Sequence, residues 1–165
     1  MLNAGMFSSA TPEWYTPDWI LERVGRVLDG IDLDPCADGE RHVPARCHYT
    51  VQDDGLSRSW IGTVFVNPPY GRVIGAWTGK LLAEVEAGHV TAAIALVPAR
   101  TDTSWFEPLH DYPVCYLRGR VRFSGHETGA PFPSALVYLG PNTARFAAEF
   151  VDVGRIVVPL RLEAA

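Results

Sequence analysis

The chain has 165 residues, of which 47% are hydrophobic and 20% are charged, a balance typical of one globular domain. Its longest apolar run, residues 90–98, is too short to cross a bilayer, its first residues lack a signal-peptide pattern, and its three cysteines do not suggest a disulfide framework, so we expect a cytoplasmic protein. The formal net charge of −5 counts against nucleic acid as a partner, because neutralising phosphates requires a positive surface.

The pattern of residues predicts alternating helices and strands behind a flexible N-terminus at residues 1–11, with one domain over 12–165. Pro17 precedes apolar residues at helical spacing, which predicts a helix that ends at Gly30. Three further helices are predicted, at 74–87, 103–110 and 143–150. Strands are predicted at 31–34, 47–50, 63–66, 91–97, 114–117, 121–123, 135–139 and 156–160.

This alternation predicts an α/β fold with a central, mostly parallel sheet covered by helices on both faces. The continuous apolar strands at 63–66 and 91–97 suit the buried, parallel centre of such a sheet. Ligands of open α/β sheets bind outside the carboxyl ends of the strands. Two unusual segments, residues 34–38 and 67–70, follow predicted strands and are expected at that edge.

The segment Asn67-Pro68-Pro69-Tyr70 has the strongest chemical content. Its two prolines stiffen the path of the chain, and the residue before a proline is held extended, which can aim the Asn67 amide into a cleft. Tyr70 offers an aromatic ring for stacking. The alternative is a rigid strand-to-helix turn that carries a surface tyrosine.

The segments in order resemble a known family. Asn67–Tyr70 resembles the tetrapeptide of the amino-methyltransferases, and most of the chain, from about Trp14 to Leu139, resembles more closely the small phage-type DNA N-6-adenine methyltransferases. The segments that carry this resemblance are Glu13-Trp14-Tyr15-Thr16-Pro17, Asp32-Leu33-Asp34-Pro35-Cys36-Ala37, Asp53-Asp54-Gly55-Leu56, Trp60, Phe65-Val66-Asn67-Pro68-Pro69-Tyr70-Gly71, Gly119-Arg120-Val121-Arg122-Phe123 and Pro131-Phe132-Pro133-Ser134. The resemblance implies a reduced, Rossmann-like methyltransferase domain that uses S-adenosyl-L-methionine.

The resemblance also implies the catalytic residues, Asn67, Pro68, Pro69 and Tyr70. Hydrogen bonds from the exocyclic amino group of adenine to the Asn67 side chain and the Pro68 carbonyl would localise the nitrogen lone pair. Tyr70 would stack on an adenine rotated out of the DNA. Methyl transfer would then be direct, without a covalent enzyme intermediate. The biological settings that the resemblance suggests are restriction-modification and protection of a phage genome.

The implied cofactor contacts are Asn67, the segment Trp14, Tyr15, Thr16 and Pro17, the turn Asp34, Pro35, Cys36 and Ala37, and Asp53 or Asp54. Asp34 would lie near the methionine portion, although the glycine-rich turn of the wider family is missing here. Asp53 or Asp54 would accept from the cofactor's adenine. Without the resemblance, Asp34 is an aspartate that ends a strand, and Asp-Asp-Gly is a solvated turn.

The implied substrate contacts are Tyr70, Arg118, Arg120, Arg122, Phe123 and Phe132, with Arg72 and Arg100 as further basic residues. Alternation puts the arginines at 118, 120 and 122 on one side of a strand, where they could meet phosphates or form a solvated face. Phe123 and Phe132 could contact the base or belong to the core. No metal is expected, because the cysteines and histidines between Cys36 and His48 lack the spacing of a zinc site.

We therefore expect a site-specific DNA adenine-N6 methyltransferase. The alternatives are methylation of an RNA base or a protein glutamine amide, and a catalytically inactive relative that binds cofactor or DNA. Because the chain is too short for a separate recognition domain, base readout is expected from loops at 40–60 and 123–134 or from a second subunit in a homodimer.

Overall fold

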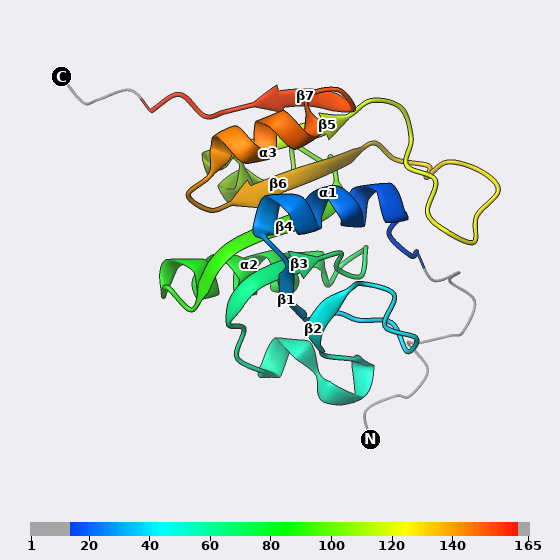
Figure 1. Ribbon diagram of the computed structural model, residues 1–165, viewed down its shortest axis with the longest axis vertical. Coiled ribbons are helices and arrows are strands. Elements are labelled where there is room, and N and C mark those ends of the chain that lie inside the picture. Colours follow the sequence, from blue (N-terminus) through cyan, green and yellow to red (C-terminus); the bar gives the residue numbers. More distant parts are fainter. Residues whose placement is uncertain (1–13, 162–165) are drawn as a thin grey trace.

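The computed structural model describes residues 14–161 and consists of one seven-stranded sheet between helices (Figure 1). The predicted flexible segment 1–11 and Glu13 lie outside the described residues. The elements are α1 (Asp18–Leu28), β1 (Ile31–Asp34), β2 (Ala45–His48), the 3-10 helices η1 (Val51–Asp53) and η2 (Gly55–Ser57), β3 (Gly62–Val66), α2 (Ile74–Glu86), β4 (Val90–Pro98), the 3-10 helix η3 (Glu107–Asp111), β5 (Val114–Leu117), β6 (Ser134–Leu139), α3 (Thr143–Phe150) and β7 (Gly154–Val157). Within the described residues, no helix is long and apolar enough to span a membrane.

The sheet has the strand order β2-β1-β3-β4-β6-β5-β7 and mixes two directions. β2, β1, β3 and β4 pair in parallel, whereas β6 pairs antiparallel with β4 and with β5, and β7 pairs antiparallel with β5. The paired residues of the antiparallel half outnumber those of the parallel half, so the prediction of a mostly parallel sheet is wrong. The reason lies in the connection between β5 and β6, which contains no helix to carry the chain across a face, so the chain reverses and β6 lies between β4 and β5.

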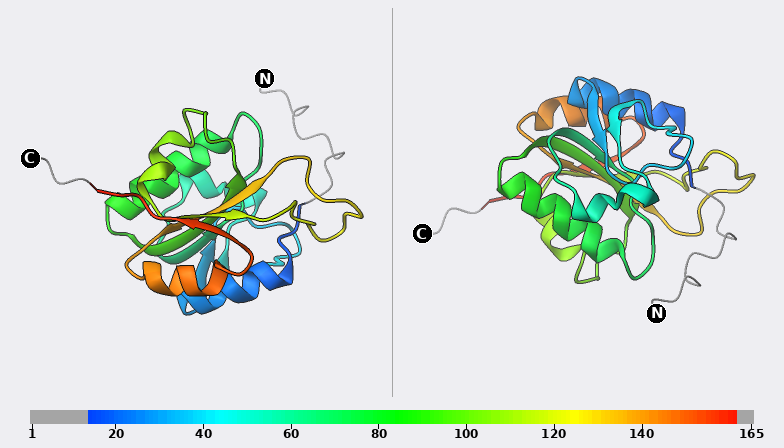
Figure 2. Two further views of the ribbon diagram at one scale, coloured as in Figure 1. Left: turned by 90° about the horizontal axis from the view of Figure 1, so that it is seen from above. Right: turned by 90° about the horizontal axis from the view of Figure 1, so that it is seen from below.

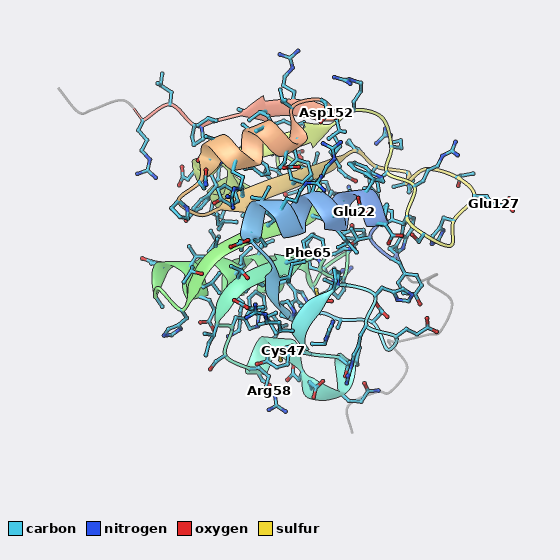
Figure 3. All side chains as sticks on the ribbon, in the orientation of Figure 1. Glu22, Cys47, Arg58, Phe65, Glu127 and Asp152 are labelled. Atoms are coloured by element: carbon cyan, nitrogen blue, oxygen red, sulfur yellow. The ribbon has the colours of Figure 1, made fainter. Side chains whose placement is uncertain are left out.

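Helices cover both faces of the sheet, as predicted (Figure 2). Alternate residues of each strand point to opposite faces. Phe65 packs on the face covered by α1 and α3, whereas Val64 and Val66 pack on the face covered by α2. Figure 3 shows Phe65 near the centre of the molecule. Two arginines of α1 form salt bridges with the region of α3: Arg23 with Asp152, which follows α3, and Arg26 with Glu149 on α3.

Two predicted elements are absent from the structure. Residues 121–123 do not form a strand: the backbone oxygen of Val121 accepts from Ala130 at 2.8 Å, and the following Ser124 forms an isolated bridge with Tyr15. Residues 103–110 form turns followed by η3 in place of an α-helix, since Pro108 lacks the N–H that a helix needs. The strands predicted at 47–50 and 156–160 begin two residues earlier, as β2 and β7; Thr50 instead caps η1.

Candidate active site

The two segments singled out in the sequence meet at the carboxyl edge of the parallel strands. From β1 the chain goes to β2 on one side and then to β3 on the other, so the strand order reverses between β1 and β3. Asp34 ends β1, and Asn67 follows β3. The Cys36 thiol donates to the backbone oxygen of Asn67 at 3.1 Å and joins the two segments directly. Such a reversal is where open α/β sheets bind ligands.

The side chain of Asn67 has partners at both ends of its amide. Its Nδ2 donates to the backbone oxygen of Trp14 and to Oγ1 of Thr16, each at 3.1 Å. Its Oδ1 accepts from the Tyr70 hydroxyl at 2.9 Å. A carbonyl oxygen has two lone pairs, so the Asn67 oxygen keeps the capacity to accept a second hydrogen bond.

Tyr70 belongs to a cluster of aromatic rings beside Asn67. The Tyr70 ring meets Phe132 edge-on, with 5.1 Å between centroids, and meets Phe123 at 6.4 Å. Trp14 lies against Phe123 at 5.1 Å and stacks on His126 at 4.4 Å. Burial raises the pKa of Tyr70, which keeps its hydroxyl protonated and able to donate. The cluster holds the Tyr70 ring in one position next to the Asn67 amide.

A pocket of about 490 Å³ opens beside Tyr70. It lies at the ends of β3 and β4, and its volume falls within the range of small-molecule sites. Its lining residues are Tyr70, Gly71, Arg72, Ile74, Pro98, Arg100, Trp105 and Phe132. The pocket therefore combines aromatic rings with two exposed arginines, Arg72 and Arg100. Trp105 was missed by sequence reasoning; its place shortly after a buried strand was the available clue.

Asp34 is a carboxylate in an almost dry environment. The residue is 3% exposed, and its carboxyl oxygen accepts from the backbone N–H of Cys36 at 3.2 Å. Burial raises the pKa of Asp34 to about 7, against the opposing effects of that hydrogen bond and of His48. Burial also raises the pKa of the Cys36 thiol, which is consistent with its role as a hydrogen-bond donor. Among residues 14–161, no ion pair involves Asp34.

The Asp53-Asp54-Gly55 segment is packed against the turn that follows β1. A side chain on Gly55 would overlap the carbonyl oxygen of Pro35, and that close approach requires glycine. The indole of the fully buried Trp60 donates to the Gly55 oxygen at 2.8 Å and fixes η2. Oδ2 of Asp53 accepts from the backbone N–H and hydroxyl of Thr50, both at 2.9 Å, and these hydrogen bonds lower the pKa of Asp53. Asp54 is exposed to solvent, and its backbone adopts the left-handed conformation, with φ of 52°.

Residues 14–17 lie across the site and connect two loops. The backbone oxygen of Tyr15 accepts from Ser124 at 3.0 Å, and the Tyr15 ring stacks on His42 with 3.8 Å between centroids. Pro17 precedes α1 and is buried. The segment is thus held between the loop after β1 and the long segment between β5 and β6. Figure 3 shows Glu127 at the outer end of the latter.

The predicted row of arginines does not form as expected. Arg118, Arg120 and Arg122 are exposed, but they are not on a strand. Arg118 donates to the backbone oxygen of Asp152 at 3.2 Å and lines a separate hollow beside β7 with Arg155. Arg118 therefore does not share one face with the pocket beside Tyr70.

The two phenylalanines take different places. Phe123 is 1% exposed and belongs to the core, where its ring contacts those of Trp14 and Tyr70. Phe132 is partly exposed and lines the pocket. The core interpretation is thus confirmed for Phe123 only.

The Asn67–Tyr70 turn lies at the strand reversal of a mixed α/β sheet, beside a pocket that Tyr70 helps to line. A family model described as DNA N-6-adenine-methyltransferase (Dam) matches residues 6–136, which include the segments that meet at the site. The chain belongs to this family, as its sequence resemblance predicted. A search of curated proteins finds no match to the chain.

Proposed function

We propose that the chain transfers a methyl group from S-adenosyl-L-methionine to the exocyclic N6 amino group of an adenine rotated out of DNA. The observation that supports this most directly is the Asn67 oxygen, oriented by Tyr70 at the side of a pocket of about 490 Å³. An acceptor beside an aromatic ring suits a planar base that carries an amino group. Enzymes that modify a base take it out of the duplex, which calls for such a pocket.

The residues at the end of β1 fit the cofactor. Asp34 is a buried carboxylate without an ion-pair partner in the described chain, and the ammonium group of an amino acid would complement it. Asp53 presents a second carboxylate beside the same turn, supported by Trp60 and Gly55. When bound, S-adenosyl-L-methionine supplies a methyl group on a positively charged sulfur. We assign its binding to residues 14–17, 34–37, 53–54 and Asn67.

The chain's own contribution is to orient and activate the nitrogen that receives the methyl group. The amino nitrogen of adenine is a poor nucleophile because its lone pair is delocalised into the ring. Hydrogen bonds to Asn67 Oδ1 and the Pro68 carbonyl favour a pyramidal nitrogen with a localised lone pair. Tyr70 stacks on the base, and Pro69 keeps the turn rigid. Catalysis then rests on positioning and electrostatic complementarity.

DNA would approach from the side of the pocket that carries Arg72 and Arg100. Both arginines are exposed, and neither is in a salt bridge within residues 14–161, so they are available for phosphates. These two positive charges give the chain a local site for phosphates even though its net charge is −5. Phe132 lines the same pocket, and we propose that the exposed Arg120 and Arg122 add further contacts to DNA. We propose that residues 12–165 act as one catalytic domain in the bacterial or phage-infected cytoplasm. We also propose that the protein either forms a homodimer or recognises a short DNA sequence.

Methyl transfer from labelled cofactor to unmethylated DNA tests this proposal. We expect N6-methyladenine in the DNA, and we expect Asn67→Ala to abolish transfer while cofactor affinity stays within a few-fold. Absence of transfer despite measurable cofactor binding would contradict the proposed reaction. A loss of cofactor affinity as large as the loss of rate would leave Asn67 with its cofactor contact and remove its catalytic role.

The acidic net charge favours one alternative, a substrate other than DNA. Asn67 and Tyr70 would equally suit an amino group on an RNA base or the amide of a protein glutamine. Parallel reactions with RNA and with a glutamine-rich protein distinguish these substrates. Label in either of them, and none in DNA, would replace DNA by that substrate.

A further inference from the structure

We propose that Thr16 is a positioning residue that fixes the orientation of the Asn67 amide. The inference rests on the proposed function, because Asn67 must present its oxygen to an amino group. Its basis is the set of hydrogen bonds that Asn67 makes with the segment before α1 and with Tyr70.

The amide of asparagine is nearly symmetrical in shape, but its two ends have opposite hydrogen-bonding roles. An amino group needs the oxygen, whereas the NH2 end would repel it. Trp14 contributes a backbone carbonyl, which can only accept, so Nδ2 must face it. Thr16 takes the second proton of Nδ2, also at 3.1 Å. Tyr70 then donates to the opposite end at 2.9 Å. The three contacts agree on one orientation of Asn67.

Thr16 is well placed to hold this orientation. It is 5% exposed, so water is a poor substitute for its hydroxyl. The residue before it is tied to Ser124 through its backbone, and Pro17, which follows, starts α1. A hydroxyl fixed on both sides in this way loses little freedom when it accepts from Asn67. The segment expected to contact the cofactor therefore also holds the catalytic turn.

Thr16→Val keeps the shape of the side chain but leaves one N–H of Asn67 without its acceptor. Without this acceptor, the orientation of the Asn67 amide that faces its oxygen to the base is less favoured. We expect kcat to fall by about tenfold as a result. We expect KM for DNA to stay within about twofold. Because Thr16 also belongs to the proposed cofactor site, we expect the dissociation constant of the cofactor to change, but by less than kcat. Thr16→Ser restores an acceptor at nearly the same position, so it should recover most of kcat.

The matched control is Thr78→Val on α2. Thr78 is 2% exposed, its hydroxyl donates to the Ile74 carbonyl within α2, and Thr78 itself does not line the pocket beside Tyr70. A stability effect of losing a buried threonine hydroxyl would appear in both variants. A loss of kcat in Thr16→Val alone supports positioning. Equal kcat losses in the two variants, or no rescue by serine, would overturn the proposal.

A second readout does not depend on activity. The chain has three asparagines and one glutamine, so its side-chain amide NMR spectrum contains few signals, and Asn67→Ala identifies those of Asn67. We expect the Asn67 NH2 protons to exchange slowly with solvent in the wild type and Thr16→Ser, and faster in Thr16→Val. Fast exchange in the wild type would overturn the proposal. If the wild type methylates no DNA, the proposed function fails, while these signals still decide the role of Thr16.

Discussion

Replacing Asp34 by asparagine should stabilise the protein, and the gain should grow with pH. The substitution removes a buried negative charge while the size of the side chain and its acceptor for the Cys36 N–H are kept. Asp34 is 3% exposed, and its pKa is raised by burial from 3.8 to about 7. Between these values the folded protein holds a proton that the unfolded chain has lost.

The sign and size of the effect follow from this difference. The wild type is unaffected below pH 3.8, loses stability as the pH rises through the interval, and loses no more above about pH 7. The interval spans about 3 units (7 minus 3.8), each worth about 1.36 kcal/mol, so the loss at pH 8 is about 4 kcal/mol. At pH 5 the pH is only about one unit above the unfolded pKa of 3.8, so only about a third of this loss has occurred. The stability advantage of Asp34→Asn should therefore increase by about 2–3 kcal/mol between pH 5 and pH 8.

Urea unfolding at the two pH values, followed by tryptophan fluorescence, measures this advantage. Asp53→Asn is a control of opposite sign. Hydrogen bonds from Thr50 lower the pKa of Asp53, so its carboxylate stabilises the fold above the unfolded pKa, and that stabilisation disappears as the pH falls through the folded pKa. Asp53→Asn should therefore be destabilising at pH 8. An advantage of Asp34→Asn that is the same at pH 5 and pH 8 would refute the reasoning.

Two further predictions concern DNA. Replacing Arg72 and Arg100 together by alanine should weaken DNA binding and lower the slope of log K against log salt by about 2, because about one counterion is released per phosphate contact. Arg155→Ala, beside β7, is the control. An unchanged salt slope in the double variant would show that the two arginines of the pocket do not contact DNA phosphates. Tyr70→Ala should weaken binding of an unpaired target base by about 1–3 kcal/mol through lost stacking, whereas Tyr70→Phe should keep most of that affinity. Fluorescence of 2-aminopurine at the target position measures the effect, and equal losses in both Tyr70 variants would contradict a stacking role.

Much of the fold could be predicted because it depends on local patterns. Apolar residues at helical spacing between Pro17 and Gly30 predict α1, and the continuous apolar runs predict β3 and β4. The half of the sheet beyond β4 could not be predicted in the same way. Strand direction there depends on which edge of the sheet is free when β6 pairs, and neither propensity nor periodicity contains that information.

The candidate site divides similarly. The sequence alone determined the family and the residues Asn67–Tyr70, because two prolines between an amide and an aromatic ring form a local, ordered pattern that survives without knowledge of the fold. Only the tertiary structure decided which groups hold that turn. Thr16 and Cys36 reach Asn67 from distant parts of the chain, and Trp105 joins the pocket from beyond β4. Likewise, Arg118 faces Asp152 because the chain leaves the sheet after Leu117. Contacts between segments far apart in sequence depend on how the strands are ordered in the sheet, so they arise only when the whole chain folds.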